Sequence, residues 1–225
     1  MPLARIGGTL LFFAHIPKTG GTSVEAYLRA KGPLALHGDG AGWSRLPLQH
    51  LHRAAYAEIL PPGSYDHGFA ILRDPKARLI SEFRMRAEPV TPKLRPLGWL
   101  RLARNRAAGR PTYGLRIGRR LEFMDFDAWA MRSFDAWRRD PMYRSNHMRP
   151  QADFVDPAHR LFRFEGGLDP VFRWIDAVTG TPPAPGPFHE RRSDPMPVTC
   201  SAATEARIRE VYSDDYALLA AMDAP

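Results

Sequence analysis

The residues best suited to chemistry lie between Thr9 and Ser23, where an apolar run ends in a lysine, two glycines and two hydroxyl residues (TLLFFAHIPKTGGTS). Leu10–Ile16 has the continuous hydrophobicity of a strand buried on both faces, and the residues from Thr22 onward have helical spacing. A helix N-terminus presents backbone N–H groups and a positive dipole end, and Lys18 adds a full positive charge. This strand, turn and helix therefore predict a site for a phosphate-like group.

The alternative to a phosphate site is an ordinary turn, in which Gly20 and Gly21 only permit a tight bend and the lysine is solvated.

For the helix that follows the turn, we expect Thr22 or Ser23 to cap its start and Gly32-Pro33 to end it. The turn differs from a Walker A loop, because that motif has its lysine after the second glycine. Here the lysine precedes both glycines.

A second charged group follows a second apolar segment. Phe69–Leu72 has the pattern of a buried strand, Arg73-Asp74-Pro75 ends it, and helical spacing resumes from Ala77 to Phe83. In α/β sheets, ligands bind where strands hand over to helices. An arginine there can engage phosphate oxygens in pairs, and the hydroxyl of Ser81 can donate one further bond. The alternative is that Arg73 pairs with Asp74 or another neighbour at the helix start.

Composition places limits on the class of protein. The chain has 225 residues, 44% of them hydrophobic, which is enough for a sizeable core in one domain. Its single cysteine, Cys200, excludes an intrachain disulfide and a multi-cysteine metal site, and a reducing compartment is the simplest reading. The apolar run Leu10–Ala14 is too short for a signal peptide or a membrane span. We therefore expect a cytoplasmic protein with no membrane span.

Positive charge is concentrated in one part of the chain. The net charge is +8, and residues 89–121 alone hold nine lysines and arginines and no acidic residue. The rest of the chain is therefore close to neutral. We expect an active-site flap at about 89–121 that faces an anionic substrate, and a solvated insertion is the alternative. No RNA-binding or zinc-finger signature accompanies this segment, so we expect no nucleic-acid partner.

The rest of the chain also predicts helices and a short strand in alternation. Helices are expected at 47–60, from 126 to a stop at Asp140-Pro141, at 168–178 and at 202–221, with a short strand at 161–164. Asp125 can cap the second of these helices. The run His189–Ser193 could lie over a nucleotide. The pattern predicts one α/β domain over residues 1–225, with three α/β/α layers and a mostly parallel central sheet.

Nine contiguous residues, HIPKTGGTS (15–23), resemble the 5′-phosphosulfate-binding loop of sulfotransferases that use 3′-phosphoadenosine 5′-phosphosulfate (PAPS). The form is that of the carbohydrate sulfotransferases, which include the heparan sulfate 2-O-sulfotransferases. RDPKARLIS (73–81), an RPQ core (149–151) and YSDDYALL (212–219) resemble further segments of this family. The resemblance implies a sulfotransferase fold related to that of the P-loop NTPases. Secretory-pathway members carry a membrane anchor, so a chain without one resembles a bacterial-type relative.

The resemblance also implies roles for individual residues. The residues that would hold the 5′-phosphosulfate are Lys18, Thr19, Gly20, Gly21, Thr22 and Ser23. Arg73 and Ser81 would hold the 3′-phosphate. The residues that would line the acceptor site or steady the cofactor are Asn146, Arg149 and Gln151. A structural loop that bridges two elements is the alternative for this last segment.

Transfer also needs a base for the proton of the acceptor hydroxyl, and histidine has an unperturbed pKa near working pH. His50 is the first candidate, because its Gln-His setting between the two motifs resembles the place where relatives carry a catalytic histidine. The other candidates are His52, His67, His37 and Glu25.

Together these features predict an enzyme that moves a sulfuryl group from PAPS to a hydroxyl of an acceptor, with 3′-phosphoadenosine 5′-phosphate (PAP) as the product and no metal required. The resemblance implies a glycan acceptor, which can be anionic. Two alternatives stay open. A phosphate-nucleotide enzyme such as a small-molecule kinase would depend on Mg²⁺ and bind ATP. A catalytically silent module would bind a nucleotide or polyanion without turnover.

Overall fold

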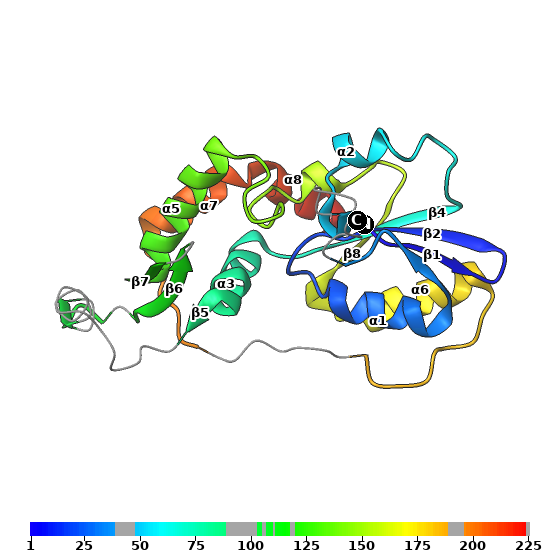
Figure 1. The fold of residues 1–225 in the computed structure, drawn as a ribbon, viewed down its shortest axis with the longest axis horizontal. Coiled ribbons are helices and arrows are strands. Elements are labelled where there is room, and N and C mark those ends of the chain that lie inside the picture. The colour runs from blue at the N-terminus through cyan, green and yellow to red at the C-terminus, as the bar shows by residue number, and fades with distance from the viewer. Residues whose placement is uncertain are drawn as a thin grey trace.

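The computed structural model describes residues 1–38, 48–88, 103–104, 107–109, 111–117, 120–188 and 196–223. Its central feature is a five-stranded sheet in the order β3-β1-β2-β4-β8 (Figure 1). The strands are β1 (Leu3–Ile6), β2 (Thr9–Ala14), β3 (Leu34–Ala35), β4 (His67–Leu72) and β8 (Arg160–Arg163). The parallel pairs are β2 with β4 and β4 with β8, while β1 runs antiparallel to both β2 and β3.

The sheet is therefore mixed, and the prediction of a mostly parallel sheet was wrong on this point. The α/β class itself is confirmed. The difference arises at β1, which forms a hairpin with β2 through Gly7 and Gly8. Gly7 has φ 59°, a left-handed conformation that glycine adopts without a steric penalty. Two glycines between apolar runs are a hairpin signal, and the sequence contains it at LARIGGTLL.

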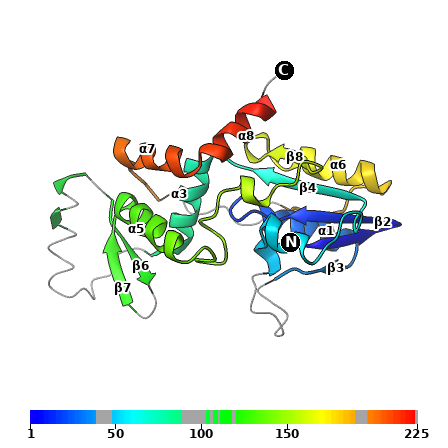
Figure 2. The same cartoon turned by 90° about the horizontal axis from the view of Figure 1, so that it is seen from above.

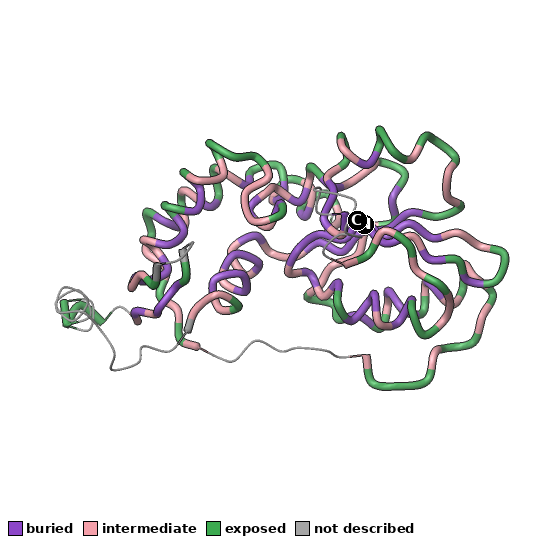
Figure 3. Tube along the Cα trace, in the orientation of Figure 1, coloured by how far each residue is buried: buried purple, intermediate pink, exposed green. Residues whose placement is uncertain are grey.

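Helices cover both faces of the sheet, which gives the three layers expected. One face packs against α1 (Gly21–Lys31) and α6 (Asp169–Thr179). The other packs against a 3₁₀ turn η1 (Leu48–His50), α2 (Arg53–Ala57), a second turn η2 (Ala152–Phe154) and α8 (Ser213–Asp223). Figure 1 shows α1 and α2 on opposite sides of the sheet, Figure 2 shows the sheet from above with β6, β7 and α5 beside it, and Figure 3 shows buried residues running along its strands.

A second core lies beside the sheet. Its three-stranded antiparallel sheet consists of β5 (Ala87–Glu88), β6 (Tyr113–Ile117) and β7 (Arg120–Met124). It packs with α3 (Pro75–Arg86), α5 (Phe126–Arg139) and α7 (Ala202–Val211) around Phe83, Trp129 and Tyr212. The predicted flap at 89–121 is thus partly β-structure, and Leu115 of β6 is fully buried. Alternating polar and apolar residues produce this strand inside a basic segment. The rest of that segment lies outside the described residues, apart from 103–104, 107–109 and 111–112.

Several helix boundaries differ from the prediction. Gly20, in a left-handed conformation, caps α1 in place of Thr22 or Ser23. The described part of the helix expected at 47–60 divides into η1 and α2. The helix expected at 202–221 divides into α7 and α8 on either side of Tyr212, and Asp215, in the first turn of α8, accepts bonds from Gln151 and Ala152. The predicted cap of α5 is confirmed, since Asp125 accepts a bond from the N–H of Ala128. A third turn, η3 (Phe164–Gly166), follows β8.

No helix in the described part of the chain has the length and hydrophobicity needed to cross a membrane.

Candidate active site

The loop of residues 15–23 connects β2 to α1 and is held tightly. Thr19 is fully buried and its hydroxyl donates to the carbonyl of Ile16 at 2.9 Å. Lys18 has φ 70° and Gly20 has φ 84°, so two left-handed residues turn the chain into the helix. A left-handed lysine is strained by about 1 kcal/mol or more, and such strain is common at ligand sites. The first N–H groups of α1 point out of the helix at this turn.

Arg73 lies directly beside this loop. It follows β4, the parallel neighbour of β2, and its Nη1 donates to the carbonyl of Lys18 at 3.1 Å. Its guanidinium also lies 4.5 Å from the centre of the Phe164 ring, which follows β8. Burial lowers the pKa of Arg73, although it remains charged at any physiological pH. The carboxyl ends of three neighbouring strands therefore bring the two predicted anion sites together.

Ser81, the second residue predicted to hold the 3′-phosphate, lies farther along α3. It lies in the second turn of α3, roughly 9 Å along the helix from Pro75, and it is buried. No hydrogen bond joins Ser81 to Arg73 in the described part of the chain. The start of α3 is instead fixed by Asp74, whose carboxylate accepts from the N–H of Ala77. The N–H of Asp74 donates to Glu165 at 2.8 Å.

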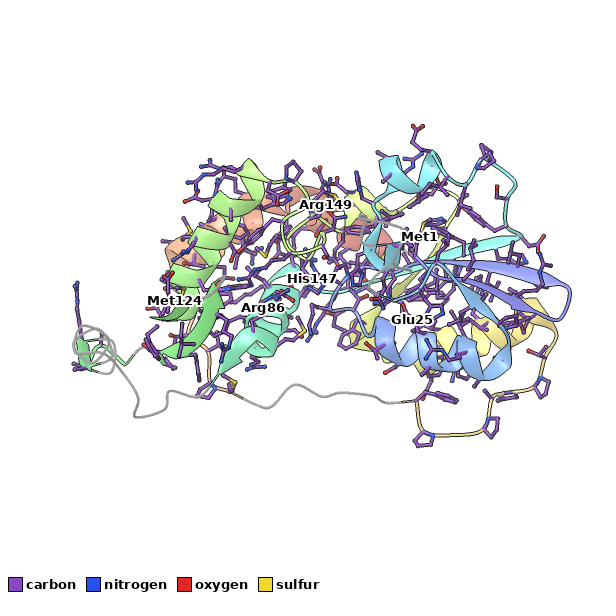
Figure 4. All side chains as sticks on the ribbon, viewed as in Figure 1. Met1, Glu25, Arg86, Met124, His147 and Arg149 are labelled. Atoms are coloured by element: carbon purple, nitrogen blue, oxygen red, sulfur yellow. The ribbon has the colours of Figure 1, made fainter. Side chains whose placement is uncertain are left out.

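Three imidazoles lie in a row beside the loop. We call this row the histidine column (His15, His50 and His147). The ring centroids of His15 and His50 are 4.5 Å apart, and those of His50 and His147 are 5.0 Å apart, both edge to face. Carboxylates hold the two ends, with His15 Nδ1 at 2.6 Å from Glu25 and His147 Nδ1 at 2.7 Å from Glu82. In Figure 4, His147 lies near α3 and Glu25 lies toward the central sheet.

The environment of His50 fixes its tautomer. Its Nδ1 lies 3.0 Å from the carbonyl oxygen of His15. Because a carbonyl oxygen can only accept, Nδ1 carries the proton and Nε2 keeps its lone pair. Burial, followed by the nearby His15 and His147, lowers the pKa of His50 well below its ordinary value. His50 is therefore a neutral imidazole with one basic nitrogen.

Glu25 is already engaged. It accepts bonds from His15 and, at 2.8 Å, from Nε2 of Gln49. Burial opposes its ionisation, but the hydrogen bond and charge of His15, together with the hydrogen bond from Gln49, outweigh this and lower the pKa of Glu25. The carboxylate thus anchors one end of the histidine column and the residue that precedes His50.

Of the three side chains predicted to line the acceptor site or steady the cofactor, Asn146 and Gln151 bind the backbone of the site, and Arg149 binds neighbouring side chains. Asn146 is fully buried and its Nδ2 donates to the carbonyl of His50 at 2.8 Å. Arg149 donates from Nε to Asn146 at 3.1 Å and from Nη1 to Asp153 at 3.0 Å. Gln151 accepts from the N–H of Arg73 at 2.9 Å and donates to its carbonyl at 2.8 Å. These three residues therefore support His50 and Arg73.

The other histidine candidates lie outside the column. His37 is exposed and lies 3.3 Å from Arg29. His67 is exposed at the start of β4, the end opposite Arg73. His52 precedes α2 beside Arg149, and burial lowers its pKa. The run His189–Ser193 lies outside the described residues.

Three residues of this site received no individual role from the sequence: His15, His147 and Glu82. His15 begins the HIPKTGGTS motif, and His147 lies in YRSNHMRPQ, so both stood in segments that the sequence marked. Nothing in the sequence pairs them with carboxylates from other helices. Within the described ranges, no group of three or more His, Cys, Asp or Glu side chains is arranged to hold a metal ion.

Comparison with known proteins identifies the family. A family model described as the sulfotransferase family matches residues 7–169, which is most of the chain. This range contains the 15–23 loop, Arg73 and the whole histidine column. No curated protein and no solved structure matches the chain. On the family match, with the loop and the arginine that it covers, the chain belongs to the sulfotransferase family.

Proposed function

We propose that this protein transfers the sulfuryl group of PAPS to a hydroxyl of a carbohydrate acceptor. PAPS carries a 5′-phosphosulfate and a 3′-phosphate on one ribose, and the protein offers the 15–23 loop and Arg73 side by side at the edge of its sheet. The observation that carries the proposal is the bond from Arg73 to the carbonyl of Lys18, at 3.1 Å. One adenosine can bridge sites that lie this close.

In this proposal the 15–23 loop holds the 5′-phosphosulfate. The residues involved are Lys18, Thr19, Gly20, Gly21, Thr22 and Ser23. Arg73 binds the 3′-phosphate, with Ser81 as a further donor. The ring of Phe164 supports the guanidinium of Arg73 from one side. Gln151 holds the backbone N–H and carbonyl of Arg73. This support keeps a flexible side chain in one orientation, which favours recognition of a phosphate.

The chemistry follows from these placements. The acceptor oxygen forms a bond to sulfur while the bond from sulfur to the 5′-phosphate oxygen breaks, and the electron pair leaves with PAP. Lys18 and the helix N-terminus stabilise the charge that develops on that phosphate. The proton of the acceptor hydroxyl goes to the histidine column, whose central member, His50, is the base predicted from the sequence. Positioning and electrostatics provide the acceleration, and the scheme requires no metal.

Two measurements test this proposal against its alternatives. Calorimetry compares PAP with ATP, each with and without Mg²⁺, and we expect PAP to bind more tightly and independently of Mg²⁺. Turnover of labelled PAPS is then measured with a panel of sugars. Tight Mg²⁺-dependent binding of ATP would indicate a kinase. Binding of PAP with no transfer to any sugar would indicate a binding module.

Arg73→Ala tests the second anion site. Loss of a charged hydrogen bond worth about 1.5–3 kcal/mol should weaken PAP binding by roughly 10–100-fold. Nucleotides that lack a 3′-phosphate, such as ADP, should be affected much less. Arg160→Ala is the matched control, because Arg160 is exposed at the far end of β8. Equal losses for PAP and ADP would contradict the assignment of the 3′-phosphate.

His50→Ala tests the histidine column. We expect kcat to fall by roughly 10–100-fold because the column loses its central ring, while PAP affinity stays within about threefold. His50→Gln, which preserves more of the buried volume, checks that the loss does not come from a cavity. An unchanged kcat in both variants would remove His50 from the mechanism.

A further inference from the structure

Glu82 and His147 form a carboxylate–imidazole pair that no part of the sequence predicted. Glu82 is 1% exposed, and it accepts from His147 Nδ1 at 2.7 Å and from Nε of Arg86. Burial opposes ionisation of Glu82, but His147 and Arg86 outweigh it and lower its pKa to about 2. An ionised carboxylate can only accept, so Nδ1 of His147 carries a proton. When His147 is neutral, its Nε2 therefore keeps a lone pair.

His147 differs from His50 in the partner that stabilises a proton. The Nδ1 of His50 faces a neutral carbonyl, and the ring is buried between two other imidazoles. The Nδ1 of His147 faces a full negative charge, and its side chain retains 14% exposure. A buried carboxylate on one nitrogen of an imidazole orients the ring and stabilises the imidazolium that forms when the other nitrogen takes a proton. Of the two rings, His147 is the one whose Nδ1 is paired with a carboxylate.

The backbone that carries His147 is held rigidly. The residues before it, Arg144, Ser145 and Asn146, have φ values of 53°, 55° and 67°. Three consecutive left-handed residues without glycine store strain of order 1–3 kcal/mol each, and surrounding contacts must hold them. Arg78, nearly fully buried, donates from Nη1 to the carbonyl of His147 at 3.2 Å. Asn146 joins this turn to the backbone of His50.

We propose that His147, oriented by Glu82, is the catalytic base that takes the proton of the acceptor hydroxyl during transfer. This inference rests on the proposed sulfuryl transfer and names the base within it. As the oxygen bonds to sulfur, its proton moves to Nε2 of His147, and the electron pair of the broken bond leaves with PAP. Glu82 stays ionised and balances the imidazolium. His50 stays neutral and orients the His147 ring by its edge-to-face contact.

The charged and titratable groups around His147 come from several elements. From α3 they are Glu82, Arg86 and Arg78; from η1, His50; from the end of β2, His15; and from its own segment, Arg144. Glu82 is the one carboxylate among these groups. Substitution of Glu82 therefore removes the only negative charge among these groups.

The first test is His147→Ala with and without added imidazole, after transfer by the wild type has been established. We expect kcat to fall by about 10²–10⁴-fold, with PAP affinity within about threefold and partial recovery in millimolar imidazole. His67→Ala is the control, because His67 is exposed at the opposite end of β4. Its kcat should match the wild type and should not change when imidazole is added. Wild-type transfer together with an undiminished kcat in His147→Ala would overturn the inference. Absence of transfer by the wild type would instead remove the proposed function itself.

The second test is the pH dependence of kcat in Glu82→Gln. The base works only when unprotonated, so loss of the anion that favours imidazolium should move the acid limb of the profile to lower pH and lower the plateau. A purely structural role would reduce kcat equally at every pH and leave the limb in place, which would contradict the proposal. If Glu82→Gln does not fold, the imidazole rescue of His147→Ala alone tests whether His147 is the base.

Discussion

Lys18→Ala is expected to reduce sulfuryl transfer by about 10²–10³-fold, the usual effect of removing one group that stabilises a developing negative charge. The substitution is clean at this position. Lys18 has φ 70°, and alanine meets the same steric restriction there, so the strain of the turn is unchanged. The carbonyl of residue 18, which accepts the bond from Arg73, is retained as well. The loss therefore reports the side chain of Lys18, whose Nζ also donates to Sδ of Met85 at 3.2 Å.

The measurement is kcat with saturating PAPS, together with the affinity for PAP. Lys18→Arg keeps the charge but replaces a compact ammonium by a planar fork, so it should recover only part of the rate. Arg138→Ala removes a cation paired with Asp135 on the exposed side of α5, and its kcat should match the wild type. Lys18→Ala with activity within threefold of the wild type would exclude the leaving-group role.

The parts of this site that the sequence could predict are those encoded by neighbouring residues. The apolar strand, the two glycines and the lysine stand side by side in HIPKTGGTS, and the expected strand, turn and helix are all present. Arg73 is similar, because its strand and helix flank it directly. In both cases local hydrophobicity and turn chemistry determine where the side chain lies.

The histidine column could not be predicted in this way. His15, His50 and His147 come from three distant segments, and only the packing of the two cores brings their rings together. Asn146 and Gln151 show the converse problem. Their hydrogen-bonding groups were expected to line the acceptor site or steady the cofactor, and in the structure they bind the main chain of His50 and Arg73. A sequence does not distinguish a side chain that binds a substrate from one that binds a buried backbone group.

Gly21→Ala is expected to destabilise the protein by about 1–3 kcal/mol and to abolish transfer, although alanine is normally the better helix residue by about 1 kcal/mol. A Cβ at Gly21 would lie 1.7 Å from Nε2 of His15 and 2.2 Å from its Cδ2. The imidazole cannot move aside, since it is 4% exposed and is held by Glu25 and by the ring of His50. Both the loop and the column must therefore shift.

Thermal unfolding and PAPS turnover measure this effect, and two further variants separate its causes. Gly8→Ala is the matched control, because a Cβ there has no atom within 4 Å, and its Tm should equal or exceed that of the wild type. In the double variant His15→Ala/Gly21→Ala the clash disappears, so stability should recover relative to the sum of the two single changes. Activity should not recover, because the column still lacks His15. A Gly21→Ala protein with wild-type Tm and turnover would show that the close approach of this ring to the loop is not required.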